Sequence, residues 1–215
     1  MDVTTKSCRE FVEMVGSSSP APGGGGAAAV VGAIGVALGN MITNLTVDRM
    51  IKTENFGDDY QSLVSVKNQF DALQTSLLDC VEADEIGFMP LAEAYKIPKD
   101  TPGRDEIMEK AKVSACGVPL KIMEMCCEAL DSLVIVSQKG SRIALSDAGC
   151  AAACCKAALQ SASLNVYTNT KTMKNRLAAD ELNRYTNLMM NKGGRLADLI
   201  FRDIEECLKK ERCDG

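Results

Sequence analysis

The sequence contains no histidine at any of its 215 positions. This absence excludes Ser–His–Asp triads, histidine-ligated zinc sites and histidine general bases. An enzyme built from this chain would have to move protons near neutral pH with a carboxylate, lysine, tyrosine or cysteine side chain. The search for catalytic groups therefore narrows to these residue types.

Aromatic residues are scarce, at 4% of the chain, and tryptophan is absent. The core must therefore consist of aliphatic, methionine and cysteine side chains. A chain of this length can bury a sizeable core. Because no long linker and no internal repeat interrupts it, we expect residues 1–215 to form a single domain.

An excess of positive charge is also missing, because the formal net charge is −5 and the sequence pI is about 5.0. Nucleic-acid binding usually requires a basic face, so no nucleic-acid partner is expected. An acidic ligand would need a local cluster of lysine or arginine side chains.

The ten cysteines include no CxxC pair. Cys126-Cys127 and Cys154-Cys155 are adjacent, and Cys150 lies four residues before Cys154. In a helix these are face positions rather than a zinc-ligand arrangement, so no metal site is expected. Most of the thiols are interpreted as small buried hydrophobic groups in a reduced, cytoplasmic protein, since no signal peptide is visible.

Helical periodicity dominates and the alternation typical of strands is scarce. We predict an all-α bundle of five or six long helices around a central buried helix rich in glycine and alanine. A turn with two prolines and a glycine is expected at 97–103, and Pro119 should cause a kink or a broken hydrogen bond near Cys116. The predicted helices cover about 6–15, 26–48, 60–95, 104–138, 147–170 and 180–210, the last with a possible interruption at 193–194.

One segment, 27–47, is long enough and sufficiently uncharged to suggest a membrane span. It is built from Ala and Gly with Asn and Thr rather than from Leu, Ile and Phe. Gly32, Gly35 and Gly39 recur at three- and four-residue spacing and would leave one face without side chains. A buried helix that packs closely against its neighbours explains this composition better than a membrane span.

The segment before that helix, 17–26, reads Ser-Ser-Ser-Pro-Ala-Pro-Gly-Gly-Gly-Gly. Pro20 and Pro22 stiffen it and lack backbone donors, whereas Gly23–Gly26 leave the main chain bare. A bare loop that leads into a helix N-terminus offers unpaired N–H groups to an anion or a carbonyl oxygen.

An acidic cluster lies late in the third predicted helix, at Asp79, Glu82, Asp84 and Glu85. Asp84 is three residues after Val81 and therefore close to the apolar face. Partial burial would raise the pKa of its carboxyl and suit it to proton transfer. The alternative is a solvated helix face, where most acidic runs belong.

Three further polar groups are candidates. Ser146-Asp147 fits a helix N-cap or a binding group. Asn165 and Asn169, one turn apart, form either a solvent-facing stripe or a hydrogen-bonding face for a heterocycle. An anionic ligand tail would find basic residues near these segments at Arg142, Lys171, Lys174 and Arg176.

Taken together, these segments resemble the cyclodeaminase/cyclohydrolase family of folate one-carbon metabolism, from Phe11 to about Leu208. The most specific part is the segment 19–25, followed by the Ala/Gly helix and Asn44-Leu45-Thr46. An acidic pair before a phenylalanine, the turn at 97–102, the Val118-Pro119-Leu120 step, and the polar groups at 146–147 and 165–166 match in order.

The resemblance implies an all-α homodimer that binds a tetrahydrofolate between helices, with no metal or other cofactor and no membrane. It implies that Asp84 is the catalytic acid/base. It also implies that the proline/glycine loop and two polar pairs bind the substrate: Pro22, Gly23, Gly24, Gly25, Ser146, Asp147, Asn165 and Asn169.

The chain also departs from the family pattern. Gly26 replaces a usual serine, Glu82 replaces the first aspartate of the acidic pair, Gly140-Ser141 replaces Gly-Asn, and Thr170 replaces a common leucine. The stretch 49–59 is a few residues longer than is typical. These differences bear on substrate choice more than on the fold.

The resemblance implies either of two reactions. A methenyltetrahydrofolate cyclohydrolase adds water to the methenyl carbon and gives 10-formyltetrahydrofolate. A formiminotetrahydrofolate cyclodeaminase closes the ring and releases ammonia, and it could work with a separate formimidoyltransferase. We favour the cyclohydrolase because no formimidoyltransferase domain is attached. A non-catalytic folate-binding protein of the same fold is a further alternative.

Overall fold

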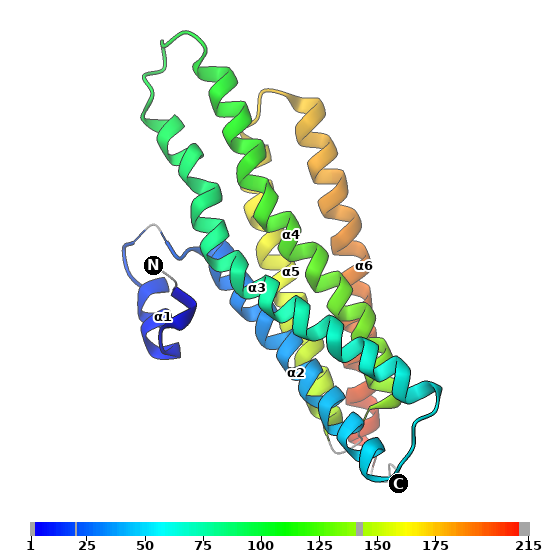
Figure 1. Ribbon diagram of the computed structural model, residues 1–215. Coiled ribbons are helices and arrows are strands. Elements are labelled where there is room, and N and C mark those ends of the chain that lie inside the picture. Colours follow the sequence, from blue (N-terminus) through cyan, green and yellow to red (C-terminus); the bar gives the residue numbers. More distant parts are fainter. Residues whose placement is uncertain (1–2, 20, 141–143, 211–215) are drawn as a thin grey trace.

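A computed structural model describes residues 3–19, 21–140 and 144–210. The described chain is helical, as the periodicity predicts, and Figure 1 shows the long helices packed side by side. The elements are η1 (Val3–Thr5), α1 (Cys8–Val15), α2 (Gly24–Lys52), α3 (Asp58–Lys96), α4 (Arg104–Lys139), α5 (Leu145–Lys171) and α6 (Arg176–Lys209).

Helix α2 packs against α3, α4 and α5, while its face with Ile34, Met41 and Leu45 stays exposed. Its glycines make this close packing possible. A Cβ at Gly35 would lie 2.7 Å from the sulfur of Cys155, and one at Gly39 would lie 2.9 Å from side-chain atoms of Phe70 and Leu133. The Ala/Gly segment is therefore the buried core helix that its composition predicts.

By length and hydropathy alone, α2 could also cross a membrane. Within the bundle, 61% of its most apolar 18-residue window is buried. A core helix of a globular protein shows the same combination of apolar composition and burial.

Helices α3 and α4 form one antiparallel hairpin, and α5 and α6 form a second (Figure 1). The main core is shared by the five helices from α2 to α6 and contains alanine, leucine, methionine and cysteine side chains. Among the described residues, Phe70 is its one fully buried aromatic ring. A second, smaller apolar cluster near the tip of the first hairpin consists of Leu91, Ala94, Met108, Ala111 and Ala115.

Helix α1 is short and lies beside the bundle (Figure 1). It begins at Cys8, two residues later than predicted, because Ser7 and Glu10 form a capping box. Phe11 and Met14 pack on the main core, whereas Val12 remains exposed.

The other predicted helices exist, with some boundaries that were wrong. Helix α2 continues to Lys52, so the polar stretch 49–59 begins inside a helix. Helix α6 begins at Arg176, four residues earlier than predicted, because Asn175 caps it through its side chain. It is not interrupted at Gly193, where a Cβ would lie 2.7 Å from Leu159. Here glycine permits close packing rather than a break.

The predicted cap of α5 was also wrong. Helix α5 begins at Leu145 with Ala144 at the N-cap, so Ser146 and Asp147 lie inside its first turn. Helix α4 runs through Pro119 without ending, as the sequence predicts for a proline inside a helix, and the turn at 97–103 lies where expected.

Candidate functional site

A cleft of about 360 Å³ opens where the N-terminus of α2 meets α3, α4 and α5. Residues 21–25 form one wall, and Asp84, Phe88 and Met89 of α3 form another. The remaining walls come from Val118 and Pro119 of α4 and from the last turns of α5. The Ala21–Pro22 peptide bond in the first wall is cis, and Pro20 lies outside the described residues.

The carboxylate of Asp84 lies against the first turn of α2. Gly23 is the N-cap of that helix and has no side chain to cap it, whereas the backbone N–H of Gly26 donates to Asp84. A Cβ added at Gly25 would overlap the Asp84 carboxylate. The glycine run therefore allows a carboxylate from a neighbouring helix to cap α2, because a helix N-terminus carries unpaired donors.

Asp84 is half-buried, and burial raises the pKa of its carboxyl above the ordinary value, since water no longer fully solvates the charged form. The hydrogen bond from Gly26 opposes this effect but does not cancel it. The predicted partial burial of Asp84 is confirmed. Its neighbours Asp79 and Glu82 do not line the cleft, whereas Glu85 does.

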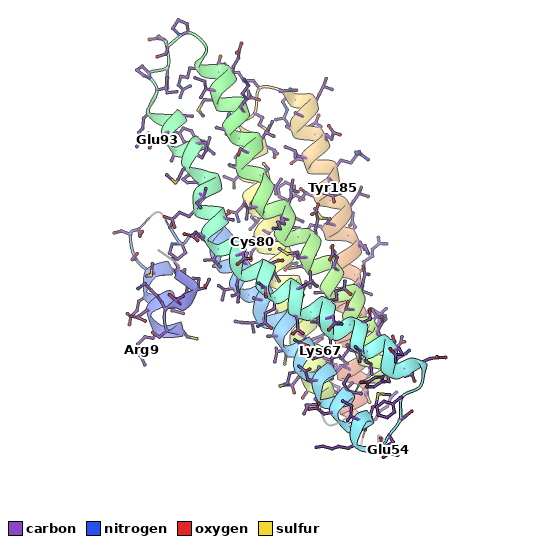
Figure 2. All side chains as sticks on the ribbon, viewed as in Figure 1. Arg9, Glu54, Lys67, Cys80, Glu93 and Tyr185 are labelled. Carbon is purple, nitrogen blue, oxygen red and sulfur yellow. The ribbon has the colours of Figure 1, made fainter. Side chains whose placement is uncertain are left out.

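Cys80, labelled in Figure 2, precedes Asp84 by one turn of α3, on the stretch that passes the start of α2. Its neighbour Val81 would lie 3.6 Å from a Cβ at Gly26. Because glycine has no Cβ at this position, Val81 of α3 can pack close to the backbone of the first turn of α2, one turn before Asp84.

The polar side chains of α5 in the cleft direct their donors to backbone carbonyls. Asn165 Nδ2 donates to Ser161 at 3.1 Å, and Thr168 Oγ1 donates to Leu164 at 2.8 Å. Asn169 Nδ2 donates to the carbonyl of Ala115 in α4 at 3.2 Å. The oxygens of these three side chains are then available as acceptors for N–H groups of a ligand.

The structure brings Pro22, Gly23, Gly24 and Gly25 together with Asp84, Asn165 and Asn169 around one cleft. Thr168, Phe88 and Pro119 also line it and were not named as site residues from the sequence. Thr168 lies three residues after Asn165, so the helical spacing of the asparagines could have identified it.

Ser146 and Asp147 do not belong to this cleft. They lie in the first turn of α5, 19 residues before Asn165, which corresponds to about 28 Å along a helix. The two polar pairs therefore do not meet within one chain, because α5 runs nearly the full length of the bundle and separates its two ends.

The basic residues proposed for an anionic tail differ in their surroundings. Lys174 forms an ion pair with Asp105, and Arg176 forms one with Asp180. Lys171 is exposed and follows the cleft residue Thr168 by three positions. Arg142 lies outside the described residues.

Within the described ranges, no group of three or more acidic or cysteine side chains could hold a metal ion. Burial raises the pKa of the Cys116 and Cys127 thiols to about 11 and that of Cys155 to about 12. These thiols are therefore protonated near neutral pH and behave as the apolar core groups expected from the sequence.

Residues 7–187 match the family model described as Formiminotransferase-cyclodeaminase. A methenyltetrahydrofolate cyclohydrolase of Methylorubrum extorquens is 34% identical over 199 residues, which cover 91% of this chain and 94% of that protein. The formimidoyltransferase-cyclodeaminase of Mus musculus is 30% identical over 93% of this chain, but the match covers only 37% of the mouse protein.

Among solved structures, a formiminotetrahydrofolate cyclodeaminase from Thermotoga maritima superimposes with a TM-score of 0.85. The match covers 96% of this chain and 99% of the other at 23% identity, and it shows that the two chains share a fold.

Proposed function

Because the chain belongs to the formiminotransferase-cyclodeaminase family, we propose that it is a methenyltetrahydrofolate cyclohydrolase that converts 5,10-methenyltetrahydrofolate and water into 10-formyltetrahydrofolate. The observation that carries the proposal is the half-buried Asp84 carboxylate at the bare N-terminus of α2, inside a cleft lined with acceptors. The similarity to the Methylorubrum cyclohydrolase along nearly its full length favours this reaction over the alternative.

In the first step, water attacks the methenyl carbon of the cationic substrate. The Asp84 carboxylate accepts one proton from that water as the C–O bond forms, which gives a neutral tetrahedral carbon bonded to N5, N10 and a hydroxyl. The carboxylate also stabilises the positive charge of the substrate before attack. A raised pKa makes this carboxyl a better proton acceptor at neutral pH than an ordinary aspartate.

In the second step, the bond between the tetrahedral carbon and N5 breaks. The Asp84 carboxyl returns its proton to N5, while the hydroxyl proton passes to solvent and the C=O bond of the formyl group forms. One proton is released per turnover, and Asp84 ends as the carboxylate. Because the carbon under attack is already cationic, the reaction requires no metal and no redox cofactor.

The backbone of α2 and the side chains of α5 supply complementary binding groups. The N–H groups of Gly24 and Gly25 have no acceptor inside the helix and suit an oxygen of the substrate. The oxygens of Asn165 and Asn169 suit N–H groups on the edge of a reduced pterin. Phe88, Met89 and Val118 supply apolar contact for the rest of the molecule.

The second candidate is a formiminotetrahydrofolate cyclodeaminase, favoured by the matches to bifunctional proteins that carry this domain. In that reaction N10 attacks the formimino carbon, and Asp84 would accept the N10 proton and donate a proton to the departing ammonia. A separate formimidoyltransferase would then supply the substrate. A non-catalytic folate-binding protein is less consistent with the position of Asp84.

The absorbance of the methenyl group distinguishes these functions. Purified protein is given methenyltetrahydrofolate or formiminotetrahydrofolate in separate reactions. We expect enzyme-dependent loss of absorbance with the first substrate. A gain of absorbance with release of ammonia from the second would instead establish the cyclodeaminase, and no change with either would refute catalysis on both.

We also propose that the protein is a cytoplasmic homodimer. The outward face of α2 carries Val31, Ile34, Leu38, Met41 and Leu45 at helical spacing and no charge over about 21 Å. Ile34 and Leu45 are each 49% exposed. An uncharged stripe of this length suits a second copy of the chain.

Light scattering after gel filtration tests the assembly. We expect a mass near 46 kDa, twice the 23.0 kDa of the chain, and a shift towards one chain in Ile34→Glu/Leu45→Glu. A stable monomer at micromolar concentration in the unmodified protein would contradict the homodimer.

A further inference from the structure

The backbone hydrogen bonds of helix α4 are interrupted at Pro119, a residue that has no part in the proposed reaction. Pro119 lies inside the helix, is buried and lines the cleft. Proline has no N–H, so the carbonyl four residues earlier, at Ala115, has no partner from its own helix. A buried carbonyl in this position requires a donor from elsewhere.

Asn169 of α5 supplies that donor, because its Nδ2 lies 3.2 Å from the Ala115 oxygen. A carbonyl oxygen can only accept, so the nitrogen of the Asn169 amide must face α4. The Ala115 carbonyl therefore determines how this amide is turned.

Because the amide of Asn169 is planar, the hydrogen bond of its Nδ2 also sets the direction in which its Oδ1 points. Asn169 lines the cleft, and no residue in the described ranges is seen to donate to its Oδ1. The cleft therefore presents Asn169 as an acceptor, whereas an unanchored asparagine could turn either end of its amide towards a ligand.

We infer that Pro119 is a positioning residue for substrate recognition: by freeing the Ala115 carbonyl, it anchors the Asn169 amide so that Oδ1 accepts a hydrogen bond from an N–H on the edge of the substrate's pterin ring. The inference rests on the proposed function for the identity of the ring. It assigns a binding role to a proline that would otherwise only weaken its helix.

A purely structural role makes different predictions. If Asn169 only satisfied a buried carbonyl, its loss would lower the unfolding temperature and leave the KM for folate unchanged. If Pro119 only shaped the cleft, its replacement and that of Asn169 would act independently. A double-mutant cycle on KM separates these cases.

The cycle uses Asn169→Leu, Pro119→Ala and the double variant, with KM and kcat measured on the folate that the protein converts. We expect Asn169→Leu to raise KM about tenfold with kcat changed less than twofold, as for one lost hydrogen bond in a binding site. Pro119→Ala restores a backbone N–H at position 119, and this N–H can donate to the Ala115 carbonyl within the helix. In that background the Asn169→Leu effect should therefore shrink to about twofold.

Pro90 provides the matched control, because it is the other proline inside a described helix and is exposed, outside the cleft lining. Pro90→Ala should leave KM unchanged, and Asn169→Leu should keep its tenfold effect in that background. An equal effect of Asn169→Leu in the Pro119→Ala and Pro90→Ala backgrounds would overturn the role of Pro119. An unchanged KM in Asn169→Leu itself would overturn the acceptor role of Asn169.

Asn169→Asp keeps the inference testable if Pro119→Ala does not fold. This variant retains acceptor oxygens but lacks the donor to Ala115, so we expect KM to rise, and a wild-type KM would refute the need for the anchor. Calorimetric affinities for tetrahydrofolate are measured on every variant, so the cycle can be read without turnover. Tight binding without turnover in the unmodified protein would refute the proposed function alone, whereas absence of binding would refute both proposals.

Discussion

Two helix N-termini at opposite ends of this bundle both have an aspartate nearby, and they differ in almost every other respect. At the start of α2, the aspartate is Asp84, which comes from the neighbouring helix α3 and receives the N–H of Gly26. At the start of α5, it is Asp147, which belongs to the first turn of its own helix. One terminus faces the candidate site, and the other does not.

The difference lies in what surrounds the carboxylate. The first residues of α2 are glycines, so the backbone is bare, and three further helices close the cleft around it. The cavity nearest the start of α5 is lined by aliphatic residues together with Ser137, Gln138 and Asp203, and neither Ser146 nor Asp147 lines it. An acid at a helix N-terminus is common, and here the candidate site is the terminus where the acid lines a cleft together with the polar acceptors of α5.

The comparison is tested most strongly by Asp84→Asn. We expect kcat for methenyl hydrolysis to fall about a thousandfold, within the range that a general acid–base contributes. The asparagine oxygen can still accept from the Gly26 N–H, so the fold should persist. Wild-type turnover in this variant would contradict the catalytic assignment.

The pH dependence of the unfolding temperature of Asp84→Asn shows whether this variant is folded and whether the Asp84 pKa is raised. The pKa of the Asp84 carboxyl is raised in the folded state, so the folded protein binds this proton more tightly than the unfolded chain does. Wild-type stability therefore declines as pH rises from the unfolded pKa, near 3.9, through the folded pKa. Asp84→Asn should unfold at a higher temperature than wild type at pH 7, and the advantage should disappear below about pH 4.

Gly25→Ala adds a side chain to the first turn of α2 and leaves Asp84 itself unchanged. Its new Cβ would overlap the Asp84 carboxylate and displace it from the α2 terminus. We expect activity to fall about a hundredfold, measured as kcat/KM, as for a misplaced catalytic group. Gly24→Ala is the matched variant, because a Cβ there would lie 3.7 Å from Asn165, an ordinary contact. Equal losses in both variants would show that the effect is not specific to Asp84.

The smallest effect is expected at the other terminus. Ser146→Ala and Asp147→Asn should each change kcat/KM less than twofold, because both residues lie outside the cleft. The unfolding temperature of Asp147→Asn should fall slightly, since this variant loses the favourable interaction of the carboxylate with the first turn of α5. A tenfold loss of activity in either variant would contradict this expectation and would show that the start of α5 belongs to the active site, for instance that of a second copy in a dimer.

Much of this arrangement could be predicted from periodicity and from the glycine-rich segment. The all-α bundle, the tightly packed Ala/Gly helix α2 and the partial burial of Asp84 follow from local spacing. The separation of Asp147 from Asn169 also follows from the sequence, because the predicted helix 147–170 places them at opposite ends, about 33 Å apart. The role of Pro119 could not be predicted, since the sequence shows the missing N–H but not the distant Asn169 whose amide replaces it.

The central claim concerns the half-buried carboxyl of Asp84, and carbon-detected NMR titration of the aspartate carboxyl groups tests it most directly. Comparison with Asp84→Asn identifies the resonance. We predict that the pKa of this carboxyl lies above the ordinary aspartate value of about 3.9, and that Gly25→Ala, which moves the carboxylate off the helix terminus, changes it. A pKa at or below the ordinary value, unchanged in Gly25→Ala, would contradict the account.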